Sequence, residues 1–278
     1  MEIGFMTWMF RESSLEEILA WASENRMLSL QLDGCPEDIG EVKGILGRHQ
    51  DVHVHVLGRS QNYLVGDASE REQRAVVLRR DIEVAADLGI GVVNIFAGRD
   101  PYKSVEDNLP IFEEVFTPLV ETAERYGVRL AMENCAQRNW WPAGGNLAST
   151  PENWRKLFEL IPSPALGLTF DPSHFVWQGL DYLKAIREFG SRIYYVHAKD
   201  TEILQDQLVD KGIYGEGWWR YRLPGWGRID WGAFFTALME IGYDGPVGIE
   251  MEDPLWNQDD SRLKQGILKA RDFLQPFV

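Results

Sequence analysis

Short apolar runs recur along the chain, and longer stretches with helical periodicity separate most of them. Runs of this length that are rich in β-branched and aromatic residues are typical of buried β-strands. Regular alternation of such strands with helices is the signature of repeated βα units. Eight runs fit this description, at residues 2–7, 27–33, 52–58, 92–98, 128–134, 166–171, 193–198 and 247–252.

The segments between these runs carry apolar residues at the spacing of an amphipathic helix. Gly89, Gly127, Gly190 and Gly242 stand where a helix would end before the next strand, as helix C-terminal glycines do. The pattern predicts helices at residues 14–25, 71–89, 105–127, 151–161, 181–190, 230–242 and 260–274.

The order of elements predicts a single α/β domain over residues 1–278, folded as a closed (β/α)8 TIM barrel. Eight strands that alternate with helices match this barrel better than an open, doubly wound sheet. An open sheet usually carries a glycine-rich phosphate loop after its first strand, and the segment GFMTWMFRESS has no such pattern. No linker or change in composition marks a second domain.

The charge of the chain narrows the range of partners. There are 43 acidic and 28 basic residues, which give a net charge of −15 at pH 7. Such a balance repels nucleic acid and an anionic membrane surface, so we expect a small-molecule ligand. No apolar run approaches the roughly 20 residues of a membrane-spanning helix. Because Cys35 and Cys135 are too few for a disulfide framework and the first residues do not resemble a secretory signal, we expect a cytoplasmic protein.

Four consecutive predicted strands end in side chains that can bind metal ions. Glu133, Asp171, His197 and Glu250 lie at the ends of the runs in AMEN, LTFD, YYVHA and GIEME. In a closed barrel the strand ends converge on one mouth, and alternate residues of each strand point inward. The neighbouring positions are apolar, as the helix-covered outer face requires. We therefore predict that the four polar side chains share the mouth.

Three carboxylates crowded in a low-dielectric mouth cannot all stay ionised unless a cation lies among them. Oxygen-rich ligation with one imidazole suits Mn²⁺, Mg²⁺ or Co²⁺ and tolerates Zn²⁺. The sequence thus predicts one divalent metal ion, with Mn²⁺ as the first choice. Taken alone, Asp171 in the sequence DPSH fits the N-cap of a helix equally well.

Several segments, AMEN, LTFDPSH, YYVHAKD, LPGWGRID and GYDGPVGIEMEDP, resemble the xylose isomerase-like TIM-barrel family of sugar and sugar-phosphate isomerases and epimerases. The resemblance covers most of the chain and is most specific over residues 130–254. It implies that the four strand-end residues bind one divalent metal ion and that Glu133 and Glu250 are the acid/base pair. It also implies that His174 contacts the substrate.

Two features distinguish this chain from other proteins that resemble this family. Relatives often carry a histidine after the Glu-Asn of the fifth strand, where this chain has Cys135. Endonuclease IV shares the barrel, but its trinuclear zinc site uses many histidines. This chain has five histidines and is strongly acidic, which argues against a role in DNA repair.

The predicted site suggests a chemistry. A metal ion that holds adjacent carbonyl and hydroxyl oxygens of a sugar acidifies the C–H bond between them and stabilises the resulting enediolate. Glu133 and Glu250, on either side of the carbon, would remove and return the proton. We therefore expect a metal-dependent isomerase or epimerase of a small sugar or keto-sugar. The alternatives are a lyase or dehydratase that acts on a keto-polyol or 3-keto-glycoside, and a barrel that binds sugar without turnover.

Three polar residues are further candidates for substrate contacts. His174 would donate a hydrogen bond to a substrate oxygen, or cap a helix and support the ligands. Lys199 would act as an electrophile near the metal, or form an ion pair with Glu252 or Asp200. His55 alternates with valines and would face the mouth, either as a substrate contact or as a satisfied histidine inside the barrel.

Two long connections follow predicted strands and so belong to the mouth. Residues 135–150 include Trp141, and residues 199–229 include Trp218 and Trp219. Aromatic rings stack on the C–H faces of sugars, and we therefore expect Trp141 to contact the substrate. The pair Trp218 and Trp219 can instead form a contact between copies of the chain, which would make the protein a homo-oligomer.

Overall fold

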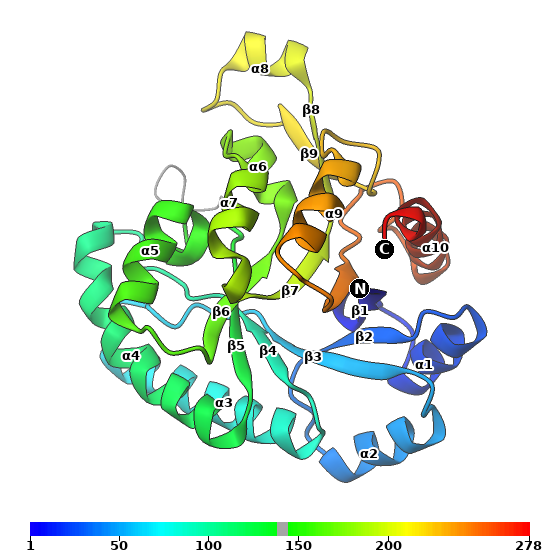
Figure 1. Ribbon diagram of the computed structural model, residues 1–278, viewed down its shortest axis with the longest axis horizontal. Coiled ribbons are helices and arrows are strands. Elements are labelled where there is room, and N and C mark those ends of the chain that lie inside the picture. The colour runs from blue at the N-terminus through cyan, green and yellow to red at the C-terminus, as the bar shows by residue number, and fades with distance from the viewer. Residues whose placement is uncertain (138–143) are drawn as a thin grey trace.

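The computed structural model describes residues 1–137 and 144–278. Eight parallel strands close into a barrel in the order β1-β10-β7-β6-β5-β4-β3-β2 (Figure 1). Each predicted strand overlaps one strand of the barrel, so the expected TIM-barrel architecture is confirmed. The barrel strands are β1 (Glu2–Met6), β2 (Ser29–Asp33), β3 (His53–Arg59), β4 (Val92–Ile95), β5 (Arg129–Glu133), β6 (Leu166–Phe170), β7 (Ile193–Ala198) and β10 (Pro246–Ile249).

Helices surround the barrel and cover its outer face (Figure 1). All seven predicted helices are present, and α2 and α6 join them. α2 was not predicted because Gly40, Gly44 and Gly47 lower its helix propensity. These helices are α1 (Leu15–Glu24), α2 (Ile39–Arg48), α3 (Ala68–Asp87), α4 (Val105–Tyr126), α5 (Pro151–Leu160), α6 (Pro172–Gln178), α7 (Tyr182–Phe189), α9 (Trp231–Glu240) and α10 (Asp260–Leu274).

The long connection between β7 and α9 contains regular secondary structure, which its length alone did not predict. It folds into an antiparallel pair, β8 (Asp200–Ile203) and β9 (Trp219–Arg222), with α8 (Gln205–Lys211) between them. This unit projects from the mouth of the barrel (Figure 1). The indole rings of Trp177 and Trp219 stack with centroids 5.0 Å apart, and Trp218 is buried. The aromatic residues therefore form a small core of their own, and Trp218 is not exposed for a contact between copies.

Asp200 fastens this projecting unit to the barrel. Its carboxylate accepts hydrogen bonds from the backbone N–H groups of Thr201, Gly225 and Ile229 and from the indole N–H of Trp231. A buried carboxylate with this many donors is well satisfied. Asp200, a charged residue that closely follows β7, therefore holds the long connection in a defined conformation.

Apolar packing is continuous from the barrel interior to the layer between strands and helices. The interior beneath the mouth depends on Gly248 of β10, where a Cβ atom would lie 1.8 Å from the hydroxyl oxygen of Tyr195. Only glycine leaves room for this buried tyrosine. It packs edge-on against His197, with ring centroids 5.0 Å apart, and so supports the mouth from below.

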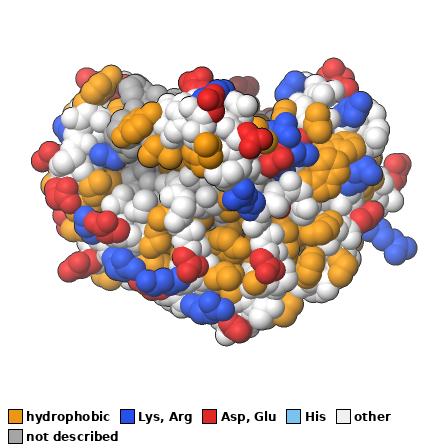
Figure 2. All heavy atoms as spheres, turned by 90° about the horizontal axis from the view of Figure 1, so that it is seen from above, with side chains coloured by type: hydrophobic (Ala, Val, Ile, Leu, Met, Phe, Trp, Pro, Cys, Tyr) orange, Lys and Arg blue, Asp and Glu red, His pale blue; other side chains and the backbone are white. Residues whose placement is uncertain are grey.

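The surface in Figure 2 carries acidic, basic and hydrophobic side chains in a mixed distribution. On this face acidic and basic side chains are therefore interspersed, and the negative net charge does not form a patch of one sign. Within the described parts of the chain, every helix is too short or too polar to cross a membrane.

Candidate metal centre

The four predicted metal ligands meet at the mouth of the barrel. Glu133 ends β5, Asp171 follows β6 directly, His197 lies in β7, and Glu250 follows β10 directly. Each side chain is buried, and each offers one ligand atom within 4.8 Å of those of the other three. The barrel thus brings together residues that are more than a hundred positions apart in the sequence.

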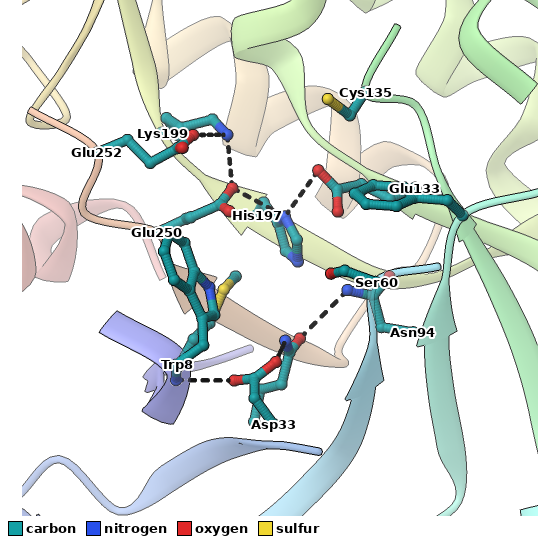
Figure 3. Close-up of a pocket in the computed structure, with 13 residues that line it drawn as sticks. Trp8, Asp33, Ser60, Asn94, Glu133, Cys135, His197, Lys199, Glu250 and Glu252 are labelled. Carbon is teal, nitrogen blue, oxygen red and sulfur yellow. Dashed lines mark hydrogen bonds and ion pairs between the residues drawn. The ribbon is translucent and has the colours of Figure 1, made fainter. Parts of the chain in front are cut away.

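The two glutamates approach the same imidazole (Figure 3). Nδ1 of His197 lies 3.6 Å from Oε1 of Glu133 and 3.3 Å from Oε2 of Glu250. Asp171 has two roles, because its Oδ1 caps α6 by accepting a hydrogen bond from the backbone of Ser173 and its Oδ2 remains for the cluster. The N-cap prediction and the metal-ligand prediction are therefore compatible for this residue.

The donor set fits a divalent cation. Nε2 of His197 is buried and has no partner among the described residues, whereas Oδ2 of Asp171 and Nδ1 of His197 make no hydrogen bond there and have only ion-pair contacts. Buried polar atoms are rarely left without a partner unless an ion or a water completes them. Three carboxylates and one imidazole are also the ligands that Mn²⁺, Co²⁺ and Zn²⁺ accept.

Protonation equilibria show how the cluster balances its charge without an ion. Burial lowers the pKa of His197, but the nearby Glu133 and Glu250 outweigh burial and raise that pKa to about 10. Burial raises the pKa of Glu133, but His197 and His174 outweigh it, so this pKa falls well below its usual value. The imidazolium thus compensates the carboxylates, and its proton competes with a metal ion.

Lys199 completes the charge balance. Its Nζ lies 2.6 Å from Glu250, 2.7 Å from Glu252 and 3.1 Å from Asp171, and 4.4 Å from the ring centroid of Tyr221. Burial lowers the pKa of Lys199, but the surrounding carboxylates raise it well above its usual value. The predicted ion pair with Glu252 is confirmed, whereas Asp200, the other predicted partner, binds the long connection instead.

His174 lies beside the cluster. Its Nε2 is 3.2 Å from Oδ2 of Asp171 and 3.4 Å from Oε1 of Glu133, and its Nδ1 is 3.0 Å from the hydroxyl of Tyr221. A ligand atom of Cys135 also lies within 4.8 Å of those of Glu133 and His174. His174 is therefore positioned to orient two ligand carboxylates.

The structure does not bring His55 to this mouth. Its Nε2 pairs with Oε2 of Glu2 at 3.1 Å, near the N-terminal ends of β1 and β3. In the ladder with β2, Leu30 pairs with Val54 and Gln31 with Val56, so His55 lies at an irregularity that interrupts the alternation of β3. His55 therefore lies at the opposite end of the barrel, and the period-two argument that directed it to the mouth does not hold across this irregularity. Trp141 lies outside the described residues.

A cavity of about 320 Å³ opens beside the cluster. It contains polar side chains that the sequence analysis did not single out: Gln31 and Asp33 of β2 and Asn94 of β4. The sequence did contain a signal for Asp33, because this residue ends its apolar run as Asp171 does. The lining residues are Met6, Trp8, Gln31, Asp33, Ser60, Asn94, Phe96, Glu133, Cys135, His197, Lys199, Glu250 and Glu252.

Comparison with known proteins agrees with this architecture. The family model for the xylose isomerase-like TIM barrel matches residues 2–276, and the chain belongs to that family. It is 34% identical to the uncharacterised protein YfiH of Bacillus subtilis over 51% of this chain and 47% of that protein. It is 27% identical to an inosose dehydratase of Clostridium perfringens over 69% of this chain and 67% of that protein.

Solved structures share the fold. The structure of L-ribulose 3-epimerase aligns with a TM-score of 0.77 at 21% identity and covers 100% of this chain and 94% of that chain. The IOLI protein with a bound zinc atom aligns with a TM-score of 0.77 at 20% identity and covers 100% of this chain and 99% of that chain. At this level of identity the likeness establishes the barrel and its strand order.

Proposed function

We propose that this protein is a divalent-metal-dependent isomerase or epimerase of a small sugar or keto-sugar, which moves a proton on the carbon next to a carbonyl. The observation that carries this proposal is that Glu133 and Glu250 both approach Nδ1 of His197, at 3.6 Å and 3.3 Å, next to a cavity of about 320 Å³. A carboxylate on one side of a carbon can remove its proton, and a protonated carboxyl group on the other side can deliver a proton to the opposite face.

The charges around the two glutamates suit this task. Burial raises the pKa of Glu250, but Lys199 and His197 together outweigh burial and lower that pKa. Glu133 is held in its ionised form by His197 and His174. Both carboxylates are thus available as bases at neutral pH. Either could therefore remove the proton, and the second glutamate would take up a proton from solvent before it protonates the opposite face of the carbon.

We assign Glu133, Asp171, His197 and Glu250 as the residues that hold the ion, with Mn²⁺ as the first choice. The bound cation would polarise the substrate carbonyl and so lower the pKa of the adjacent C–H bond. His174 would keep the Glu133 and Asp171 carboxylates oriented, and it would also donate to a substrate oxygen. A small carbohydrate is the proposed ligand.

Dehydration is the second candidate, because the same proton abstraction leads to loss of water when a hydroxyl group lies on the next carbon. The similarity to curated inosose dehydratases, 27% identity over 206 residues in one case, favours this candidate. The epimerase candidate is favoured by the fold of structures such as L-ribulose 3-epimerase. Proton abstraction by a glutamate beside a bound metal is common to both candidates.

Solvent exchange separates these candidates. The protein, loaded with Mn²⁺, is incubated in D₂O with D-fructose, D-tagatose and an inosose, and the products are followed by NMR and mass spectrometry. Deuterium uptake at one carbon without another change of mass supports the isomerase or epimerase. Loss of water supports the dehydratase. A chelator-treated sample is the control, and exchange at the same rate in that sample would contradict a metal-dependent mechanism.

A further inference from the structure

The cavity has a second polar side opposite the metal cluster. The predicted ligands come from β5, β6, β7 and β10, which form one half of the barrel, whereas Gln31 and Asp33 come from β2 and Asn94 from β4 in the other half. Figure 3 shows Asp33 across the cavity from Glu133 and Glu250, and Asn94 between them on β4, which pairs with β5. We refer to Gln31, Asp33 and Asn94 as the β2–β4 wall.

The wall residues hold one another in place. Nδ2 of Asn94 donates to Oε1 of Gln31 at 3.4 Å, and Nε2 of Gln31 donates to Oδ1 of Asp33 at 2.6 Å. Oδ2 of Asp33 accepts the backbone N–H of Trp8 at 3.2 Å. The resulting chain runs from β4 to the turn after β1 and fixes the orientation of each group.

One atom of this chain is left without a partner. Oδ1 of Asn94 makes no hydrogen bond within the described part of the chain, although the side chain is only 5% exposed. An unpaired buried acceptor costs free energy, and a hydroxyl donor from a ligand would satisfy it. Asn94 also lines the cavity, so such a ligand can reach it.

Gly58 of β3 makes room for the wall. It pairs in register with Asp33 on one side and with Asn94 on the other. A Cβ atom at this position would lie 2.1 Å from Oδ1 of Asp33 and 2.6 Å from Nε2 of Gln31. Because β3 has no side chain at Gly58, the polar groups of β2 can extend over its backbone. They can thereby reach the polar group of β4.

The charge of the cavity restricts what can bind at this wall. Of the described residues that line it, four carry carboxylates and Lys199 alone is a lysine or arginine. The Lys199 ammonium is already engaged by Glu250 and Glu252. The His197 imidazolium is likewise paired with Glu133 and Glu250, so a phosphate group near Asp33 would face carboxylates while both cationic side chains are already engaged.

We propose that the β2–β4 wall recognises the hydroxyl groups of an uncharged polyhydroxylated substrate at the end remote from the metal, and that it excludes phosphorylated sugars. This inference deepens the proposed function and rests on it for the placement of the reacting carbon at the metal. Amide and carboxylate groups in a fixed row bind adjacent hydroxyls through paired hydrogen bonds, which is the means by which a site selects a polyol.

Binding measurements test the wall separately from turnover. The Mn²⁺-loaded protein is titrated with D-fructose, D-tagatose, myo-inositol and an inosose, and with D-fructose 6-phosphate, by saturation-transfer NMR. We expect at least one neutral probe to bind and D-fructose 6-phosphate to bind at least about tenfold more weakly. Binding of the phosphate ester as tight as that of the neutral probes, or binding of no neutral probe, would overturn the proposal.

Variants locate the effect. Asn94→Leu and Gln31→Leu are expected to weaken the best neutral probe about tenfold while Mn²⁺ affinity stays unchanged. Gly58→Ala should weaken the same probe without removing any polar group. The exposed Gln50→Leu is the matched control. Unchanged probe binding in both Asn94→Leu and Gln31→Leu refutes the wall. Normal probe binding without deuterium exchange would refute the proposed function and leave the wall standing.

Discussion

The ammonium group of Lys199 lies 2.6 Å from Oε2 of Glu250, and both side chains are buried at the mouth of the barrel. The same ammonium contacts Glu252 and Asp171, so one lysine neutralises three carboxylates, two that follow β10 and one that follows β6. A buried cation in such a set stabilises the protein in the absence of metal. It also limits the negative charge available to a metal ion.

Replacing this lysine should therefore lower the stability of the metal-free protein and increase the stabilisation that a bound metal ion gives. In Lys199→Met, the buried Asp171 and Glu250 and the half-buried Glu252 lose their cation, and the metal-free protein should lose about 3–5 kcal/mol in urea unfolding. Added Mn²⁺ should then raise the melting temperature more than it does in the wild type. Lys43→Met, which removes an exposed pair with Asp87, should change stability by less than about 1 kcal/mol. A metal-free Lys199→Met protein as stable as the wild type would contradict this account.

Metal affinity should rise with pH. In the metal-free protein Glu133 and Glu250 outweigh burial and raise the pKa of His197 to about 10. The imidazole is therefore protonated at neutral pH and must lose its proton to bind an ion, so affinity should increase by up to about tenfold per pH unit between pH 6 and pH 8. Calorimetric titration with Mn²⁺ in two buffers of different ionisation enthalpy should detect a released proton. Affinity that is constant over this range would show that His197 is not a ligand.

Removal of either proposed base should abolish proton transfer. Glu133→Gln and Glu250→Gln keep the shape of the side chain but cannot accept the proton, and deuterium exchange into a substrate should fall by at least about 100-fold at saturating Mn²⁺. Glu240→Gln, an exposed substitution on α9, is the control and should exchange at the wild-type rate. Exchange within about threefold of wild type in both glutamine variants would exclude the two-glutamate mechanism.

Asp33 should make the metal-free protein less stable as pH rises. Burial raises the pKa of Asp33 from 3.8 to about 6, so the folded state binds its proton more tightly than the unfolded chain. This preference is fully present below about pH 4 and is lost as pH rises through about 6. The difference in free energy of unfolding between Asp33→Asn and the wild type should therefore favour the variant more at pH 7.5 than at pH 4. Urea unfolding at both values measures the difference, and an equal effect at the two values would contradict the shift.

Loss of the Asp200 carboxylate should release the projecting unit. Asp200→Ala leaves three backbone N–H groups and one indole N–H without their acceptor. The protein should lose at least about 3 kcal/mol. Limited proteolysis should then cut first within residues 200–229. Asp206→Ala, at an exposed site on α8, should leave the digestion pattern unchanged.

The strand ends illustrate how far sequence reasoning reaches. Period-two parity placed Glu133, His197 and Glu250 on the inner face, and the barrel does bring them together. The same reasoning placed His55 inward, although its contact is with Glu2 at the opposite end. Alternation in a run such as VHVHV is compatible with either face, because valine packs both inside the barrel and beneath the helices.

The β7–α9 connection shows a second limit. Its length and its tryptophans were evident, but pairing of Asp200 with Arg222 joins residues about twenty positions apart. Such a pairing depends on the register of the two segments and on the packing of Trp177 against Trp219. Neither can be obtained from local pattern.

The sequence alone determined the barrel, because eight apolar runs with strand periodicity, separated by amphipathic helices, leave few other ways to bury the apolar faces. It also determined the chemistry of the four strand ends. Only the tertiary structure decided which charges neutralise one another, since Lys199 selects its partners by distance across the mouth. It alone also revealed the β2–β4 wall, because that surface exists where Gly58 leaves space between side chains from different strands.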